Sequence, residues 1–290
     1  MLKVLILGSS GTLGKQIYKE LIKNSNIKLF NSGLRKRKID FTKSIELKKF
    51  ILSINPDLII NCVALTNVDE CEKNKLLSKK INCDIVTKIF KLKSEKKLTF
   101  NFIHFSTDQF YSQKGKKPSS ETSKIFMINN YCKHKRMAEL ECIKNKSLIF
   151  RTNFFGKSES KNDSFSDWIF KAFKSKKKIY LFKDIYFNPL RINTITKFIS
   201  KIIRNHKYKI TGIYNLGAKD ALNKSEFAVL FSKKVCIYHK NYISTYSNRL
   251  LKVKRSKNMF MSVKKFESMF KFKLPYVKTE INNEAKNYKL

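Results

Sequence analysis

The chain has 290 residues and 42% of them are hydrophobic, enough for one large domain or two closely joined ones. No apolar run approaches the roughly 18 residues that a membrane span needs, so we expect none. The six cysteines form no CxxC pair and no His/Cys ligand spacing. Reduced thiols in a cytoplasmic protein are therefore favoured over disulfides, and we expect no metal site.

The formal net charge of +40 has two explanations. A basic surface attracts nucleic acid or an anionic membrane. Alternatively, the whole composition is biased, because lysine, asparagine, isoleucine and phenylalanine are all abundant while arginine occurs only eight times. The lysines are spread along the chain, and arginine is the usual choice for bidentate phosphate contacts. We favour the compositional explanation and expect no specific nucleic-acid partner.

The first element is an apolar strand over residues 3–7, continuous as in a parallel strand buried on both faces. It runs straight into a glycine-rich turn, so the N-terminal run is interpreted as a strand and not as a signal peptide. A helical pattern follows the turn. Strand, glycine turn and helix together bind a dinucleotide pyrophosphate, because glycines let the backbone approach and the helix N-terminus supplies N–H donors. The predicted cofactor contacts are Gly8, Ser10, Gly11, Thr12, Leu13 and Gly14.

The second strand, over residues 27–32, indicates which cofactor is bound. An acidic residue that closes this strand holds the ribose of NAD, whereas a basic residue suits the extra phosphate of NADP. Here the strand is followed by a basic stretch that contains Arg35, and Asp40 comes slightly later, near the adenine. We therefore expect NADPH, with NADH as the alternative.

A helix over 43–54 leads to the third strand, 57–64. Cys62 and Ala64 are small residues at its end, which leaves room for the ribose and nicotinamide at the carboxyl edge of the sheet. A long helix over 75–97 follows, in which Asn82 is a polar position.

The fourth strand, 99–105, is followed by Ser106, Thr107 and Asp108. Ligands of open parallel sheets lie beyond the carboxyl ends of the strands, so these side chains are predicted to face the site. On the next helix, 128–143, Tyr131 and Lys135 are four residues apart and share a face. The pair alone arises easily by chance in a chain so rich in both residues. Its position after the hydroxyl-bearing strand end makes it a candidate for proton transfer.

Beyond the fifth strand, 147–151, the alternation of strands and helices becomes irregular. We expect an α/β fold, a Rossmann-type doubly wound parallel sheet with a smaller C-terminal substrate-binding lobe. Residues 1–153 form the NAD(P)-binding domain and 154–290 mainly the lobe, with about 185–217 returning to the first domain. The remaining expected elements are helices at 165–173, 193–204 and from Ser225, a strand at 212–217, and a loop at 184–191.

In this order the motifs resemble the extended short-chain dehydrogenase/reductase superfamily, and most closely its dTDP-4-dehydrorhamnose reductase family. The resemblance covers nearly the whole chain. It rests on Gly8–Gly14, Asn55–Asn61, Ser106–Asp108, Tyr131–Lys135, Leu148–Thr152 and Gly212–Leu216.

The resemblance implies reduction of the 4-keto group of a nucleotide-linked deoxysugar, for surface-polysaccharide synthesis. It assigns Tyr131 as the proton donor, Lys135 as the group that lowers its pKa and binds the nicotinamide ribose, and Thr107 as the residue that orients the carbonyl. Ser106, Asp108, Asn153 and Phe154 are the implied substrate contacts.

The sequence departs from the family pattern at positions facing the sugar. Cys132 and His134 replace a glycine and a hydroxyl residue between the tyrosine and the lysine, and Phe154 stands where a tryptophan is expected. Two alternatives therefore stay open: an epimerase or dehydratase on the same scaffold, and a non-catalytic cofactor-binding regulatory subunit. The sequence is also compatible with a homodimer.

Overall fold

The structure is a computed structural model that describes residues 1–31, 39–113 and 115–288. The chain divides into two compact units, between which it passes several times. Unit 1 comprises Met1–Ser106, Asn129–Phe150 and Thr196–Ile213, and unit 2 comprises Thr107–Ile128, Arg151–Ile195 and Tyr214–Leu290. The cofactor and substrate roles that the sequence assigned to the two parts of the chain stay predictions.

A six-stranded sheet has the order β10-β5-β4-β3-β1-β2. The pairs β1–β2, β1–β3 and β3–β4 are parallel, as predicted for continuous apolar strands. Because β1 has β2 on one side and β3 on the other, the winding reverses at β1, and ligands bind at such a switch point. The predicted α/β Rossmann-type class is confirmed. The strands are β1 (Leu2–Leu7), β2 (Ile27–Asn31), β3 (Leu58–Asn61), β4 (Asn101–Thr107), β5 (Leu148–Thr152) and β10 (Gly212–Leu216).

Two strand boundaries differ from the prediction. β3 ends at Asn61 and not at residue 64, because the Asn61 side chain accepts a hydrogen bond from the backbone N–H of Val63 and turns the chain. β4 pairs in register with β3 from Asn101 onward and continues to Thr107. Ser106 and Thr107 are therefore the last residues of the strand and do not follow it.

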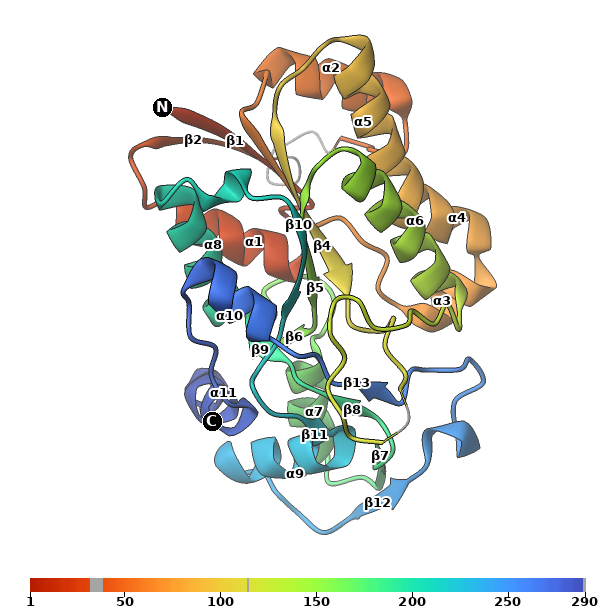
Figure 1. Ribbon diagram of the computed structural model, residues 1–290. Helices are drawn as coiled ribbons and strands as arrows, with labels where there is room; N and C mark the ends of the chain where they lie inside the picture. Colours follow the sequence, from red (N-terminus) through yellow and green to blue (C-terminus); the bar gives the residue numbers. More distant parts are fainter. Residues whose placement is uncertain (32–38, 114, 289–290) are drawn as a thin grey trace. The chain divides into compact units, whose positions relative to one another are not determined.

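Helices cover the strands of unit 1 on both sides (Figure 1). On one side, a buried apolar cluster joins Leu5, Leu7 and Ile59 of the strands to α2, α5 and α6. Among the described residues, no helix is long and apolar enough to cross a membrane. The helices named here are α1 (Thr12–Leu21), α2 (Ser44–Ile54), α5 (Ile85–Glu95), α6 (Asn130–Lys144) and α8 (Ile192–Arg204).

The predicted single helix over 75–97 is wrong. The segment begins earlier and is divided into α3 (Val68–Lys73), α4 (Lys75–Lys79), a π-helical turn (Lys80–Asp84) and α5. The π-helical turn contains Asn82, whose amide accepts from the N–H of Leu65 at 2.9 Å and donates to its carbonyl at 3.0 Å. A side chain that satisfies both backbone groups of a loop residue fixes that loop, so Asn82 is a tether and not simply a polar helix position.

Unit 2 is built from short strands and helices around a phenylalanine-rich core. The strands form the sheet β11-β8-β13 and the pairs β12–β7 and β6–β9, so the predicted loop over 184–191 is wrong at β8 and β9. The rings of Phe155, Phe165, Phe187 and Phe227 contact one another in T-shaped and tilted pairs, with centroids 4.8–5.8 Å apart. The strands are β6 (Phe154–Phe155), β7 (Ile179–Phe182), β8 (Tyr186–Phe187), β9 (Leu190–Arg191), β11 (Leu222–Asn223), β12 (Tyr242–Thr245) and β13 (Asn258–Met259), and the helices are α7 (Phe165–Lys174), α9 (Lys224–Lys234), α10 (Lys264–Phe270) and α11 (Val277–Ala285).

Helix α9 begins one residue before the predicted cap, Ser225. Asn223 is the N-cap: its side chain accepts from the N–H of Glu226 at 2.8 Å, and the Glu226 carboxylate accepts from the N–H of Asn223 at 2.9 Å. This reciprocal capping box places Lys224 in the first turn of the helix.

Gly14 leads to a prediction about stability. A Cβ at this position would lie 2.3 Å from the carbonyl oxygen of Gly8, so backbone would have to move to admit it. Although alanine is favoured over glycine inside a helix by about 1 kcal/mol, we expect Gly14→Ala to lower the free energy of unfolding by about 1–3 kcal/mol. Urea denaturation measures the change. Gly11→Ala is the matched control, because its Cβ meets the same oxygen at 3.4 Å. Equal effects of the two substitutions would contradict the steric argument.

Candidate active site

The turn after β1 is closed by backbone contacts that leave no room for a side chain at Gly8 or Gly14. Gly8 has φ +78°, and a Cβ there would lie 2.9 Å from the carbonyl carbon of Cys62. The N–H of Gly11 donates to the carbonyl of Gly8 at 3.0 Å, and α1 starts at Thr12. Gly14 packs the first turn of α1 directly onto Gly8. The turn therefore aims the helix N-terminus across the sheet's switch point, which is the arrangement that holds a pyrophosphate.

Three predicted cofactor contacts on this turn differ in exposure. Ser10 is exposed and Thr12 is half-buried, so their side chains are accessible to a ligand. Leu13 is buried in the core, so only its backbone is available.

Two predicted contacts with the adenosine half of the cofactor remain predictions. Arg35 lies outside the residues that the structure describes. The Asp40 carboxylate accepts from the N–H of Thr42 at 2.9 Å and from its hydroxyl at 2.7 Å, and these bonds hold the pKa of Asp40 below its usual value. Asp40 therefore stabilises a turn, whatever else it binds.

At the end of β3, Cys62 and Ala64 are both half-buried. The N–H of Cys62 donates to the carbonyl of Leu7, which joins the carboxyl ends of β1 and β3. Burial raises the pKa of the Cys62 thiol strongly, so this cysteine is a small neutral side chain at the switch point.

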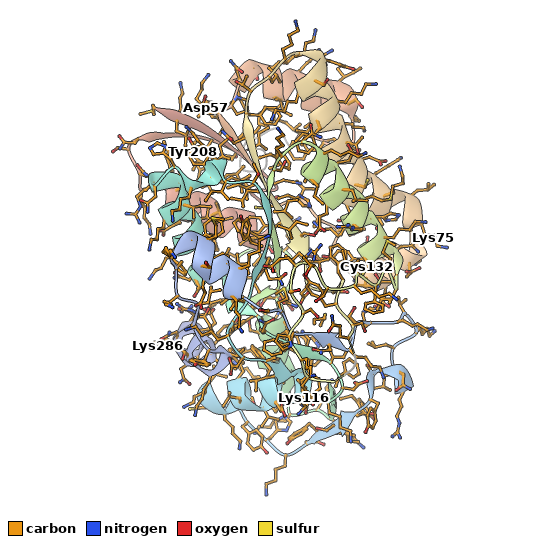
Figure 2. All side chains as sticks on the ribbon, in the orientation of Figure 1. Asp57, Lys75, Lys116, Cys132, Tyr208 and Lys286 are labelled. Atoms are coloured by element: carbon orange, nitrogen blue, oxygen red, sulfur yellow. The ribbon has the colours of Figure 1, made fainter. Side chains whose placement is uncertain are left out.

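Tyr131 and Lys135 lie on the first two turns of α6, one residue before and three residues after Cys132, which is labelled in Figure 2. Both are buried, with 6% and 2% exposure. The start of the helix is fixed by two side chains. Asn129 accepts from the N–H of Cys132 at 2.9 Å, and the Glu72 carboxylate accepts from the N–H of Asn130 at 2.6 Å.

Lys135 is held in the interior of unit 1. Its ammonium donates to the carbonyl of Phe105 at 2.7 Å and lies 3.4 Å from Nε2 of His104. Burial lowers the pKa of Lys135 to about 8, although the Glu139 carboxylate acts in the opposite direction. A lysine of this kind is poised to act on a neighbouring tyrosine, because its charge favours the tyrosine anion.

Asn61 and His104 were not among the residues predicted for the site. Nδ2 of Asn61 lies 3.2 Å from Nδ1 of His104, and both side chains are buried. The only signal in the sequence is a polar residue in each of two apolar strands.

The predicted substrate contact Ser106 has a protein partner in unit 1. Its hydroxyl donates to the Glu139 carboxylate at 2.9 Å, and Glu139 is paired with Arg136. The polar side chain of Ser106 thus ties β4 to α6.

Of the three predicted catalytic residues, Tyr131 and Lys135 belong to unit 1 and Thr107 belongs to unit 2. Thr107 accepts from the N–H of Gln109 at 3.2 Å, and its hydroxyl lies 3.4 Å from the carboxylate of Asp108. Asn153 donates to the other carboxylate oxygen of Asp108 at 2.7 Å. The structure therefore brings three of the predicted residues, Thr107, Asp108 and Asn153, into one hydrogen-bonded group.

Lys224 lies close to this group and was not predicted. It is half-buried, with its ammonium 4.0 Å from the ring centroid of Phe165 and 3.6 Å from that of Phe187. Burial lowers the pKa of Lys224 to about 8 and raises that of Asp108 to about 6, while the attraction between their opposite charges opposes both shifts. The sequence offered no signal, because one half-buried lysine cannot be recognised among so many exposed ones.

Unit 2 contains a cavity of about 320 Å³ beside these residues. Aromatic walls, two amides and two cations suit a polar or anionic ligand with an apolar face. Phe154, a predicted substrate contact, is half-buried in β6 and is not among the described residues that line the cavity. The polar and aromatic residues that line the cavity include Gln109, Asn153, Phe165, Trp168, Lys224 and Arg255.

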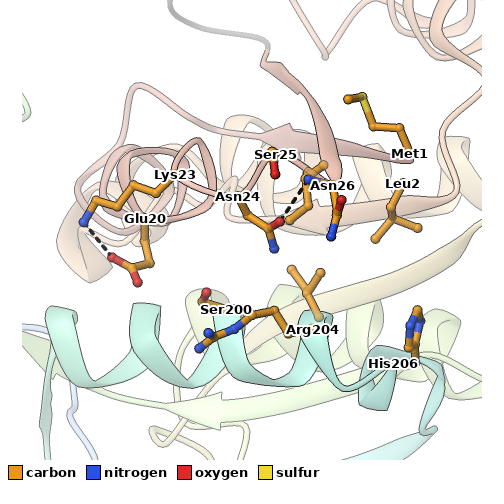
Figure 3. A pocket seen from close by; sticks show the side chains of 12 residues that line it. Met1, Leu2, Glu20, Lys23, Asn24, Ser25, Asn26, Ser200, Arg204 and His206 are labelled. Carbon is orange, nitrogen blue, oxygen red and sulfur yellow. Dashed lines mark hydrogen bonds and ion pairs between the residues drawn. The ribbon is translucent and has the colours of Figure 1, made fainter.

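A larger hollow of about 780 Å³ in unit 1 has a different location (Figure 3). It is formed by the turn between α1 and β2, where Asn24 accepts from the N–H of Asn26, and by Arg204 and His206 at and beyond the end of α8. Met1 and Leu2 place it at the amino end of β1. Cofactors of such sheets bind at the carboxyl ends, so this hollow is not the cofactor site.

The family described as the RmlD substrate binding domain matches residues 2–290. The dTDP-4-dehydrorhamnose reductase of Escherichia coli K12 is 25% identical over 287 residues, covering 94% of each chain. The solved structure of a dTDP-4-dehydrorhamnose reductase from Clostridium acetobutylicum has a TM-score of 0.87 at 22% identity, covering 99% of both chains. That of the enzyme from Bacillus anthracis in complex with NADP also has a TM-score of 0.87, at 21% identity, covering 99% of this chain and all of the other. These solved structures share the fold of this chain.

The Lys224–Asp108 pair leads to a prediction about pH. Lys224→Met removes the ammonium that favours the Asp108 anion, so we expect the pKa of Asp108 to rise above about 6. A carboxyl group whose pKa is raised by folding stabilises the protein below its unfolded pKa of about 4, and this stability is lost as the pH rises through the folded value. In Lys224→Met the free energy of unfolding therefore continues to fall up to a higher pH than in the natural sequence.

NMR titration of the Asp108 carboxyl carbon and unfolding free energies between pH 4 and pH 8 measure the two effects. Lys234→Met, an exposed substitution on the same helix, is the control and should leave both unchanged. An Asp108 pKa that stays the same in Lys224→Met would contradict the coupling.

Proposed function

The chain belongs to the family of the RmlD substrate binding domain, and we propose that it is an NADPH-dependent reductase of a nucleotide-linked 4-keto-6-deoxysugar. The family resemblance drawn from the motifs is thereby confirmed. The activity is that of the relatives named dTDP-4-dehydrorhamnose reductase. The observation that carries the proposal is the buried Tyr131–Lys135 pair at the start of α6, in the same unit as a glycine turn that fits a dinucleotide.

The residues of unit 1 fit a nicotinamide dinucleotide. Side chains are excluded at Gly8 and Gly14, where the pyrophosphate needs close approach of the backbone. The half-buried Cys62 and Ala64 leave space for the nicotinamide ribose. When bound, NADPH supplies the hydride.

The chain's own residues supply the proton and the orientation. Tyr131 donates its phenolic proton to the oxygen that develops charge at the 4-position of the sugar. Lys135 favours the tyrosine anion that results, because its ammonium is held in a low-dielectric interior. Thr107 donates a hydrogen bond that orients the keto oxygen. Asp108 and Asn153, already bonded to each other, contact the sugar hydroxyls.

The product is a nucleotide-activated deoxysugar, which suits the synthesis of surface polysaccharide. We place the reaction in the cytoplasm, and sedimentation would show whether the enzyme is the homodimer with which the sequence is compatible. NAD that stays tightly bound through purification would favour the epimerase or dehydratase alternative. Cofactor binding without turnover of any keto sugar, with co-purification of a second enzyme, would favour the regulatory subunit.

Tyr131→Phe tests the proton donor. Since a placed general acid contributes about 10²–10⁴-fold, we expect turnover of dTDP-4-dehydrorhamnose with NADPH to fall by this factor. NADPH binding should persist, which fluorescence titration shows. Tyr180→Phe, on an exposed tyrosine of β7, is the control and should retain full activity. Undiminished turnover in Tyr131→Phe would rule out the assigned role.

Arg35→Ala tests the cofactor preference. An ionic hydrogen bond to the 2′-phosphate contributes about 1.5–3 kcal/mol, so KM for NADPH should rise about 10- to 100-fold while KM for NADH stays constant. Steady-state kinetics with both cofactors measure the ratio. Arg204→Ala, at an exposed arginine of α8, controls for the loss of one positive charge. Equal changes for NADPH and NADH would contradict the assignment.

A further inference from the structure

Three buried polar side chains form a row across unit 1, from β3 through β4 to α6. Asn61, His104 and Lys135 are 2%, 1% and 2% exposed. Nδ2 of Asn61 lies 3.2 Å from Nδ1 of His104, and Nε2 of His104 lies 3.4 Å from Nζ of Lys135. An imidazole bonded on both sides in an apolar interior has its proton position determined by its partners.

The orientation of the Asn61 amide is determined first. The backbone N–H of Val63 points to Oδ1 of Asn61 at 3.1 Å, and an N–H can only donate. The oxygen therefore lies on that side, and the amide nitrogen is the atom that faces His104. Exchanging the two amide atoms would place one donor against another at Val63, so the backbone fixes the amide.

The His104 tautomer follows from the Asn61 orientation. The amide nitrogen donates to Nδ1, which must therefore carry a lone pair. Burial, together with the charge of Lys135, lowers the pKa of His104 well below its usual value, so the ring is neutral at neutral pH. A neutral imidazole has one proton, and here it is on Nε2. That N–H points toward the nitrogen of Lys135.

The Lys135 nitrogen thus has an acceptor on one side and a donor on another. The carbonyl of Phe105 accepts from it at 2.7 Å, whereas the His104 N–H opposes an ammonium and suits a neutral amine. Of the other ionisable groups around it, the Glu139 carboxylate of α6 favours the charged form. Cys142 of α6 and Cys62 after β3 are neutral thiols, because burial raises their pKa values. Burial of Lys135 outweighs the effect of Glu139.

We propose that Asn61 locks His104 in the Nε2-protonated tautomer, and that the locked ring is a positioning residue that fixes the Lys135 amine and opposes its charge. Its effect on turnover rests on the proposed reductase activity, but the tautomer itself does not. The device makes the charge of Lys135 sensitive to pH near neutrality.

Asn61→Asp reverses the lock. A carboxylate at this position still accepts a hydrogen bond from the backbone N–H of Val63. Because it has no proton to donate, it can bond the imidazole only as an acceptor, so Nδ1 of His104 becomes protonated. Nε2 then accepts from the Lys135 ammonium and stabilises it. Asn67→Asp is the matched control, because Asn67 is an N-cap that accepts from the N–H of Glu70, and aspartate caps equally well.

Nitrogen-15 NMR of the imidazoles reads the tautomer directly, and the chain has only four histidines. His104→Phe assigns the His104 signal. We expect a neutral, Nε2-protonated His104 in the natural sequence and in Asn67→Asp, and an Nδ1-protonated ring in Asn61→Asp. An Nδ1-protonated or charged His104 in the natural sequence at pH 7 would overturn the proposal. The measurement needs no substrate, so it stands even if the chain is not a reductase.

The pH profile of turnover tests the consequence for Lys135. Activity falls as pH rises through the pKa of Lys135, near 8, because the ammonium is lost. In Asn61→Asp this fall in activity should shift to higher pH by about one unit. In Asn67→Asp the profile should stay unchanged. Where Asn61→Asp does not fold, His104→Phe removes the opposing N–H and keeps the packing against Phe102, and its fall in activity should also shift to higher pH. A fall in activity that stays in place or shifts to lower pH in either variant would overturn the positioning role.

Discussion

The backbone contact at the switch point of the sheet is the constraint on which the cofactor half of unit 1 depends. Gly8 approaches the backbone after β3 so closely that a Cβ would lie within 3 Å of it, and Gly14 brings α1 even closer to Gly8. Van der Waals repulsion therefore selects glycine at both positions before any ligand binds. The same contacts aim the N-terminus of α1, so the stability of the turn and the binding of a pyrophosphate have one geometric origin.

Burial of charge is the second organising constraint, and it acts in each unit separately. Lys135 in unit 1 and Lys224 in unit 2 both have lowered pKa values for the same first cause, desolvation. Their partners differ. Lys135 has a carbonyl and a neutral imidazole, while Lys224 has aromatic faces and a buried aspartic acid. The net charge of +40 gives no indication of these two groups, because it counts exposed lysines and lysines withdrawn from water alike.

Local patterns predicted the elements whose causes are local. The apolar run of β1, the glycine turn, α1 and the Tyr131–Lys135 face of α6 all follow from residues close together in the chain. The strand pairs β6–β9 and β7–β12 could not be predicted in this way, because strands of two to four residues carry no usable periodicity and depend on distant partners. Asn61, His104 and Lys224 were missed for the same reason: each is defined by contacts with other segments.

The positions at which the chain departs from its family's motifs can be compared with what those side chains contact. His134, which replaces a hydroxyl residue, forms a 2.8 Å hydrogen bond from α6 to Ser78 of α4, and Cys132 donates its N–H to the helix cap Asn129. Both bonds hold α6 in place, and they lie on the helix that carries Tyr131 and Lys135. The departure at His134 thus supports the helix through its side chain, whereas the bond of Cys132 comes from its backbone and does not depend on the residue type. The unit 2 cavity, by contrast, is lined by Lys224, whose positive charge favours the Asp108 anion.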